Sequence, residues 1–374
     1  MAYIITADLV PMNNIRHLRW IAPLLAACLL SACGSMETDQ ERSIDATWTE
    51  VQTISGSEEI PESLMNQPRA LGVHPDGYVI VADANPPRVL IYEANGNFHG
   101  TIGREGQGPG EYENINQLFT AEDGSIVVQD HMSGRFQWFD IDGNLLGDMT
   151  PPQFALHLEP QADGYLAIQS PRQDSLLFYH ADEKMRKVGE PFGPLREWID
   201  WDDPVTRVSF HVYPPVITEE LLFTSPQYYG GHVYALERVD ATWANPRVIG
   251  GVSVDRAYEV KDGMQRGDGL RMFTSTDEGP ITVIPENVSL GQGQLPDGYI
   301  INVLALKEAD GYVLGIDVFN EEGAHLGFAP LDREEESSLP GLALGLHHID
   351  EDGRLYFTDA RSASIRVFEV ELDL

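Results

Sequence analysis

The chain has 374 residues, of which 42% are hydrophobic, so it can form one large all-β domain or two ordinary ones, and global disorder is excluded. The 59 acidic residues outnumber the 24 basic ones, which gives a formal net charge of −35. A surface this negative repels phosphate backbones, and no basic patch offsets it, so nucleic-acid binding is excluded as well.

The N-terminal stretch has the pattern of a targeting sequence. Arg16 and Arg19 precede an apolar run over residues 20–30, which is too short to span a bilayer. The run leads into Leu-Ser-Ala-Cys, which ends at Cys33. This motif resembles the bacterial lipobox, in which signal peptidase cuts before a cysteine that carries diacylglycerol. The resemblance implies a signal peptide over residues 1–32 and a lipidated Cys33; the alternative is an ordinary secretory signal with a chance cysteine.

Cleavage before Cys33 would leave a mature chain without a disulfide, because the other cysteine, Cys28, lies inside the apolar run. Met12 would start a more usual signal peptide and is an alternative start of the chain. Residues 33–45 are polar and charged, which predicts a flexible tether. Gly34 rather than Asp follows the anchor cysteine, and by the sorting rule of enteric bacteria this favours the outer membrane over the inner one.

An internal repeat organises the remaining sequence over residues 46–374. Its clearest copy, residues 71–103, contains short apolar strands joined by the hairpin turns Asp76-Gly77 and Asn95-Gly96. A period of roughly 40–50 residues with four short strands is typical of propeller blades. We therefore predict an all-β, six-bladed β-propeller with four-stranded antiparallel blades. The third strand of each repeat ends at Tyr92, Phe139, Tyr179, Leu236, Phe319 and Phe368.

Two places depart from the simple repeat. The interval from Leu236 to Phe319 is the longest, and it holds either one blade with an insertion near residues 254–279 or a seventh, degenerate blade. The last repeat lacks a fourth strand, whereas residues 47–54 alternate as a strand does and precede the first full repeat. We expect this N-terminal strand to close the ring and remove an open edge. The alternative is an open β-sandwich with a frayed N-terminus.

Two stretches carry a family resemblance. Residues 81–89 (VADANPPRV) resemble the NHL repeat, and residues 102–112 (IGREGQGPGEY) are similar to the glycine-rich linker after a blade in six-bladed propeller lipoproteins of environmental and gut bacteria. The resemblance is strong over residues 68–150 and loose over residues 154–331. It implies the propeller fold and says little about activity, because one fold hosts many functions.

Three aspartates, Asp83, Asp130 and Asp359, occupy matching positions at the ends of second strands. Equivalent positions of a propeller converge on one face, so these carboxylates could together hold a hard cation such as Ca²⁺. The alternative is that each carboxylate caps its own turn by accepting hydrogen bonds from backbone N–H groups. The repetition favours the capping role, and no other cofactor is expected.

Two aromatic loop clusters are candidate ligand sites. Trp198 and Trp201 lie among acidic residues, and Tyr228, Tyr229 and His232 lie in a second loop. Aromatic rings beside carboxylates can stack on a sugar ring or anchor a protein partner. The alternative is that the tryptophans fill the base of an insertion.

Hydrolase motifs are absent from the sequence. It contains neither a Gly-x-Ser-x-Gly elbow nor a His-Glu-x-x-His pair. A Ser-His-Asp triad assembled from different blades is an alternative that the sequence does not exclude. His347 and His348 are adjacent in a predicted strand, where alternation would place their rings on opposite faces.

The sequence therefore predicts a membrane-anchored extracytoplasmic propeller in the bacterial cell envelope, a monomeric domain that acts as a binding or protein-interaction module without catalysis. Its partners would be the membrane, through the lipid, and a protein or carbohydrate ligand. Two alternatives stay open: a metal-dependent hydrolase or lyase with its site in the propeller channel, and a structural subunit of an envelope complex.

Overall fold

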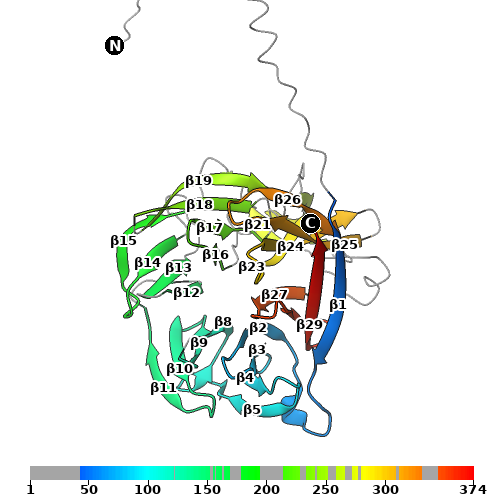
Figure 1. Ribbon diagram of the computed structural model, residues 1–374. Coiled ribbons are helices and arrows are strands. Elements are labelled where there is room, and N and C mark those ends of the chain that lie inside the picture. Colours follow the sequence, from blue (N-terminus) through cyan, green and yellow to red (C-terminus); the bar gives the residue numbers. More distant parts are fainter. Residues whose placement is uncertain are drawn as a thin grey trace, which may run out of the picture. The chain divides into compact units, whose positions relative to one another are not determined.

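A computed structural model of the chain shows a propeller of β-sheets (Figure 1). The compact unit spans Arg42–Leu374. The structure describes residues 43–121, 123–151, 155, 157–161, 164–168, 178–193, 214–227, 233–240, 242–251, 258–265, 272–276, 279–308, 311–330 and 344–374.

The described strands form six four-stranded antiparallel sheets, which confirms the predicted six-bladed propeller. Blade 1 contains β2 (Pro68–Val73), β3 (Val79–Ala84), β4 (Pro87–Tyr92) and β5 (Phe98–Ile102). Blades 2 and 3 contain β8 (Ile115–Thr120), β9 (Ile126–Asp130), β10 (Arg135–Phe139), β11 (Leu145–Met149), β12 (His157–Gln161), β13 (Gly164–Ile168), β14 (Phe178–Ala181) and β15 (Lys187–Phe192). Blades 4 and 5 contain β16 (Val216–Ile217), β17 (Leu221–Thr224), β18 (Val233–Val239), β19 (Thr242–Gly250), β23 (Asn287–Gln294), β24 (Ile300–Glu308), β25 (Gly311–Phe319) and β26 (His325–Pro330). Blade 6 contains β27 (Leu344–Ile349), β28 (Leu355–Asp359), β29 (Ser364–Asp373) and β1 (Asp45–Ile54).

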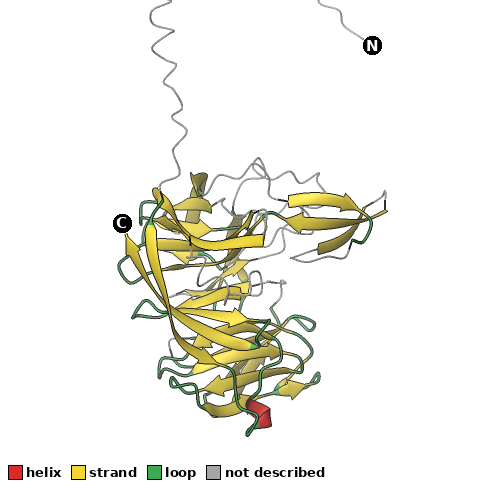
Figure 2. Cartoon of the chain, turned by 90° about the vertical axis from the view of Figure 1, so that its right-hand side faces the viewer, coloured by secondary structure: helices red, strands yellow, loops and turns green. Residues whose placement is uncertain are grey.

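Other described elements lie between or beside the blades. A short parallel pair joins β6 (Arg104–Glu105) to β7 (Glu111–Tyr112), and a 3-10 helix, η1, spans Pro61–Ser63. Figure 2 shows η1 in red among the strands. In the described part of the chain, no helix is both long and apolar enough to cross a membrane.

The long interval between repeats contains a separate three-stranded sheet, and the alternative of a seventh blade is wrong. Its strands are β20 (Tyr258–Asp262), β21 (Met272–Thr276) and β22 (Gly279–Pro285), with β22 in the middle. This sheet overlaps the stretch 254–279 that the sequence marked for an insertion.

Every pair of neighbouring blades shares a hydrophobic cluster, so each sheet is buried on both faces. The consequence is visible in the second strands. All five residues of β9 (IVVQD) and of β28 (LYFTD) are buried. Such strands lack the alternation of apolar and polar residues of a half-exposed strand, because neither of their faces meets water.

The N-terminal strand closes the ring, as predicted, and rules out the frayed β-sandwich. β1 pairs antiparallel with β29, from Asp45 opposite Asp373 to Ile54 opposite Ile365. Trp48 packs into the cluster between blades 5 and 6, and Ile54 packs into the cluster between blades 6 and 1. One strand thus contributes to both neighbouring interfaces of the last blade.

An ion pair joins the two closing strands. The guanidinium of Arg366 on β29, which is 6% exposed, donates to the carboxylate of Glu50 on β1, with Nε 3.2 Å from Oε1. The hydrogen bond from Arg366 lowers the pKa of Glu50 below its ordinary value of 4.5. The pair therefore stabilises the closed ring at neutral pH.

Replacing Glu50 by glutamine should destabilise the propeller in a pH-dependent way. A carboxyl with a lowered folded-state pKa stabilises the fold above its unfolded pKa, and this contribution disappears as the pH falls through the folded-state pKa. At pH 7 the free energy of unfolding should therefore fall by about 1–2 kcal/mol in the Glu50→Gln variant. As the pH falls through the folded-state pKa of Glu50, which lies below 4.5, the variant and the wild type should converge. Urea unfolding across pH measures both effects, with Glu371→Gln, at an exposed site on β29, as the control. A difference that does not change with pH would contradict the electrostatic explanation.

Candidate functional site

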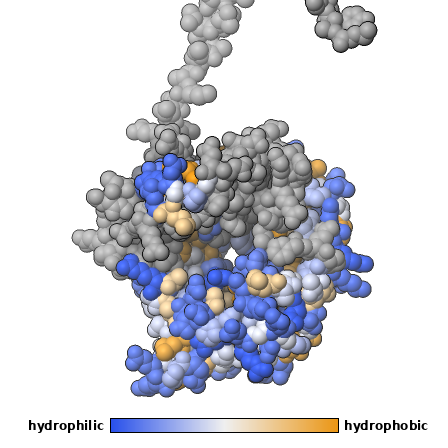
Figure 3. Space-filling view, turned by 180° about the vertical axis from the view of Figure 1, so that it is seen from behind, coloured by the Kyte–Doolittle hydropathy of each residue, from blue (hydrophilic) through white to orange (hydrophobic). Residues whose placement is uncertain are grey.

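A cavity of ≈570 Å³ lies where the innermost strands of the six blades meet. Residues of β2, β8, β12, β23 and β27 line it, together with residues 214–216 at the start of β16. These strands surround the centre of the ring in Figure 1. Figure 3 views the ring from behind and shows a mostly hydrophilic described surface, with hydrophobic residues in small scattered groups.

β-Bulges in the innermost strands deliver side chains to this cavity. The pairing register shifts around Arg69 in β2, around Asn116 in β8 and around His347 in β27. A bulged residue is left out of the ladder, which re-aims its side chain. All three bulged residues line the cavity. The bulges thus place a guanidinium, an amide and an imidazole from three consecutive blades at the axis.

Arg69 presents a partly unoccupied guanidinium. Its Nη1 donates to Oδ1 of Asn114 at 2.7 Å, and the backbone N–H of Asn114 donates to the buried carboxylate of Asp130 at 3.2 Å. The remaining N–H groups of Arg69 have no hydrogen-bond partner among the described residues. The guanidinium is therefore held at one nitrogen and free along its other edge.

His157 of β12, in blade 3, has two competing partners. Its Nε2 lies 3.2 Å from Nε2 of Gln117 and 3.3 Å from Oε2 of Glu159. The amide of Gln117 is fixed, because it also accepts from and donates to the backbone of Leu158. A single ring nitrogen carries either a lone pair or a proton. His157 therefore accepts from Gln117 or donates to Glu159, but not both at once.

His347 and His348 contact the same face of β28, so the expectation that they point to opposite faces is wrong. Nε2 of His347 lies 3.0 Å from Oγ1 of Thr358, and the ring of His348 packs edge-on against Tyr356 with the centroids 5.7 Å apart. Thr358 and Tyr356 are two residues apart on one strand and therefore share a face. The bulge at His347 breaks the alternation on which the expectation depended.

His347 is neutral at physiological pH although the cavity exposes its ring to solvent. Desolvation by the surrounding protein lowers its pKa to about 4, and the charge of the His157 imidazole contributes in the same direction. The interaction links blade 6 with blade 3, which stand opposite each other in the ring. A ligand in the cavity would therefore meet imidazoles from both sides.

Gln292 of β23 places an unpaired acceptor at the cavity. Its Nε2 donates to the backbone oxygens of Pro214 at 2.7 Å and Phe223 at 3.2 Å, whereas its buried Oε1 has no partner among the described residues. Buried polar atoms are usually hydrogen-bonded, so an unpaired one needs an explanation. The neighbouring wall, residues 214–216, is apolar.

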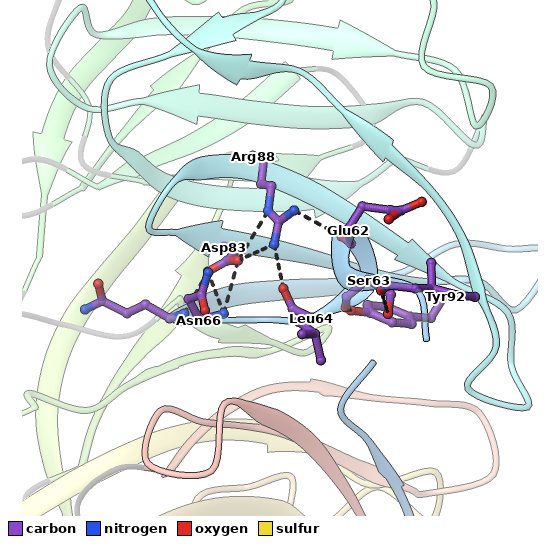
Figure 4. Close-up of polar contacts among 9 residues, drawn as sticks. Glu62, Ser63, Leu64, Asn66, Asp83, Arg88 and Tyr92 are labelled. Atoms are coloured by element: carbon purple, nitrogen blue, oxygen red, sulfur yellow. Dashed lines mark hydrogen bonds and ion pairs between the residues drawn. The ribbon is translucent and has the colours of Figure 1, made fainter. Parts of the chain in front are cut away.

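The sequence-predicted aspartates lie in the blades rather than at the axis. The carboxylate of Asp83 accepts from the backbone N–H of Gln67 at 2.7 Å and of Asn66 at 3.2 Å, and it pairs with Arg88 at 3.2 Å (Figure 4). Nη2 of Arg88 also donates to the carbonyl of Leu64. Asp83 therefore joins the loop before β2 to the turn after β3.

Asp130 and Asp359 hold equivalent turns. Asp130 accepts from the backbone N–H of Asn114 and from the hydroxyl of Ser133 at 3.0 Å. Asp359 accepts from the backbone N–H of Arg361 at 2.9 Å. All three predicted aspartates are at most 1% exposed. The structure does not bring them together, and among the described residues no group of three or more His, Cys, Asp or Glu side chains is placed to hold a metal ion.

The other predicted site residues lie outside the described part of the chain: Cys33, Trp198, Trp201, Tyr228, Tyr229 and His232. Conversely, Arg69, Asn116 and Gln292 were not singled out from the sequence. One signal for the first two was present, because Arg69 and Asn116 both stand seven residues before the aspartate of an Asp-Gly turn, in consecutive repeats.

A family model described as a 6-bladed beta-propeller matches residues 61–193, which contain blades 1 to 3. No curated protein sequence matches the chain. Among solved structures, the chain is similar to a putative exported protein from Bacteroides fragilis (11% identity, 90% of this chain and 98% of that one, TM-score 0.49). It is also similar to a gluconolactonase from Xanthomonas campestris (13%, 82% and 87%, TM-score 0.48) and to BamB from Moraxella catarrhalis (12%, 86% and 100%, TM-score 0.43). These likenesses are too remote to assign an activity.

Replacing Asp83 by alanine should destabilise the fold strongly. The change would leave Arg88 without its buried counter-charge and two backbone N–H groups without an acceptor. The expected loss in the free energy of unfolding is about 3–5 kcal/mol. Asp76→Ala is the matched control, because the side chain of Asp76 is 76% exposed. Calorimetric melting with and without a chelator separates capping from cation binding: capping predicts no effect of the chelator, and a chelator-induced fall in Tm that Ca²⁺ reverses would contradict it.

Proposed function

We propose that this protein is a lipid-anchored, extracytoplasmic binding module that holds a small ligand in its central cavity. The observation that carries the proposal is the set of side chains with unused hydrogen-bonding groups at the axis, above all the free edge of Arg69 and the unpaired Oε1 of Gln292. The cavity volume of ≈570 Å³ lies within the range of roughly 300–1,000 Å³ of small-molecule sites.

The contrast between the blades and the axis supports a binding role. Within the blades, the charged groups of Asp83, Asp130 and Arg88 are satisfied by neighbouring backbone or side chains. At the axis, by contrast, Nε and Nη2 of Arg69 and the buried Oε1 of Gln292 have no hydrogen-bond partner among the described residues. Unsatisfied buried groups cost free energy, so they are expected where a ligand or bound water completes them.

Binding fits the cavity better than catalysis. The described residues that line it include no Ser, Cys, Lys or Tyr. The hydroxyl of Thr120 is engaged with the backbone oxygen of Val73 at 2.7 Å. An activated nucleophile next to a free base is therefore lacking in this part of the chain, whereas hydrogen-bonding groups for ligand recognition are present.

The lipobox supports the anchoring part of the proposal. Cys33 stands about a dozen residues before β1, the first strand of the propeller. A short polar tether of this kind would keep the binding domain close to the membrane that holds the lipid. One acyl-modified cysteine with two or three chains suffices for stable attachment.

The Cys33→Ala variant should leave the membrane fraction and appear in the soluble extracytoplasmic fraction, because it lacks the thiol that would carry the lipid. Fractionation followed by immunoblotting measures this redistribution. Cys28→Ala is the matched control and should stay membrane-bound. Membrane retention of Cys33→Ala would refute the lipid anchor at this position.

Filling the cavity should abolish ligand binding without unfolding the protein. The Asn116→Trp variant places an indole at a bulge on the axis, and Leu146→Trp places the same group at a 60% exposed site on the outer strand β11. A thermal-shift screen with small polar metabolites should give shifts in Tm for the wild type and for Leu146→Trp, but not for Asn116→Trp. Shifts that persist in Asn116→Trp, or that no compound produces, would refute the cavity as the binding site.

A further inference from the structure

We propose that the ligand of the central cavity is a small hydroxylated carboxylate of the sugar-acid class, with its carboxylate bound by Arg69. This inference rests on the proposed function and specifies it. It follows from three features of the cavity: a guanidinium with a free edge, an acceptor that lacks a donor, and an acid that is already partnered.

Arg69 supplies the carboxylate site. Guanidinium groups bind carboxylates through two parallel N–H···O bonds, and this needs a free edge of the planar group. Asn114 occupies only Nη1, which fixes the orientation of the guanidinium and leaves Nε and Nη2 available. Asp130, through the backbone of Asn114, holds the loop that carries this support. Among the described residues that line the cavity, Arg69 is the sole Lys or Arg, in a chain with a net charge of −35.

Gln292 and His347 favour hydroxyl groups on the same ligand. The unpaired Oε1 of Gln292 needs a donor, which an ionised carboxylate cannot provide and a hydroxyl can. Nε2 of His347 is engaged with Thr358, whereas its Nδ1 has no partner among the described residues. A neutral imidazole nitrogen of this kind either donates to or accepts from a hydroxyl.

The acidic side chain of Glu159 does not make the cavity a binding site for cations. It is the one acidic side chain of the described lining, and its Oε2 lies 3.3 Å from Nε2 of His157. When Nε2 of His157 carries the proton and donates to Glu159, a cationic ligand would have to displace this contact, whereas an anionic ligand meets free donors at Arg69. The cavity therefore selects anions over neutral or cationic molecules of the same size.

Isothermal titration calorimetry of the full protein with D-glucuronate and D-glucose tests the inference, because these probes differ only in the carboxylate at C6. We expect glucuronate to bind roughly tenfold or more tightly than glucose. The Arg69→Gln variant should lose this preference. The Arg69→Lys variant should keep only part of it, because an ammonium cannot form the bidentate hydrogen bonds of a guanidinium. Arg361→Gln, at an exposed turn outside the cavity, should behave as the wild type.

A second readout uses pH. A bound carboxylate would raise the pKa of His347 from its value of about 4, so binding would be coupled to proton uptake. Glucuronate affinity should then increase as the pH falls from about 7 to about 5. The His347→Gln variant lacks the imidazole that would take up the proton, so its pH profile should be flatter than that of the wild type.

The outcomes separate the two proposals. Equal affinity for glucuronate and glucose, or a preference that survives in Arg69→Gln, would overturn the carboxylate site but leave the binding module intact. The screen could also find compounds that shift the Tm of the wild type but not of Asn116→Trp, while glucuronate does not bind. This result too would overturn the carboxylate site and leave the binding module intact. Absence of any cavity-dependent ligand would overturn both proposals.

Discussion

The structure depends on the closure of the ring by β1. Each blade is a sheet that buries both faces, so each needs a neighbour on either side, and six hydrophobic clusters supply these interfaces. A fully buried Val, Leu or Ile stabilises the fold by about 1.5–3 kcal/mol relative to an exposed one. Without β1, the last blade would lose its outer strand, the contribution of Trp48 to one interface and that of Ile54 to the next. Closure therefore affects all the blades, and through them the strands that border the axis.

Closure also fixes the geometry of the central cavity. The innermost strands meet at the axis only because the outer interfaces hold the blades in a ring. Bulges in β2, β8 and β27 then direct Arg69, Asn116 and His347 into the space that is left. The scaffold and the candidate site use their polar groups differently. Asp83 and Asp130 satisfy backbone groups inside the blades, whereas Arg69 and Gln292 at the axis keep polar atoms without a partner among the described residues.

The sequence predicted the scaffold well and the candidate site poorly, for a physical reason. Repeat period and turn residues are local properties, so the blade number and the closing strand could be predicted from them. The backbone partners of Asp83 could not, because they are Asn66 and Gln67 in the loop before β2 rather than residues of its own turn. The face to which a side chain points depends on pairing register, and one bulge reverses it. His347 shows this directly, because its ring lies on the same side as that of His348 despite their adjacent positions. The unpaired Oε1 of Gln292 depends on Pro214 and Phe223, and such distant contacts leave no local pattern.

The Asp-Gly turns that revealed the repeat have a further consequence. The innermost strands all run in the same direction, so the turns that follow them, with Asp76, Asp123, Asp297 and Asp352, emerge on one side of the disc. The turns between second and third strands emerge on the other side, where Arg88 balances the buried Asp83. These four aspartates are exposed, so they place repeated negative charge around that side of the disc. Close to an anionic lipid surface, repulsion between these carboxylates and the lipid headgroups would turn that side of the disc away from the membrane.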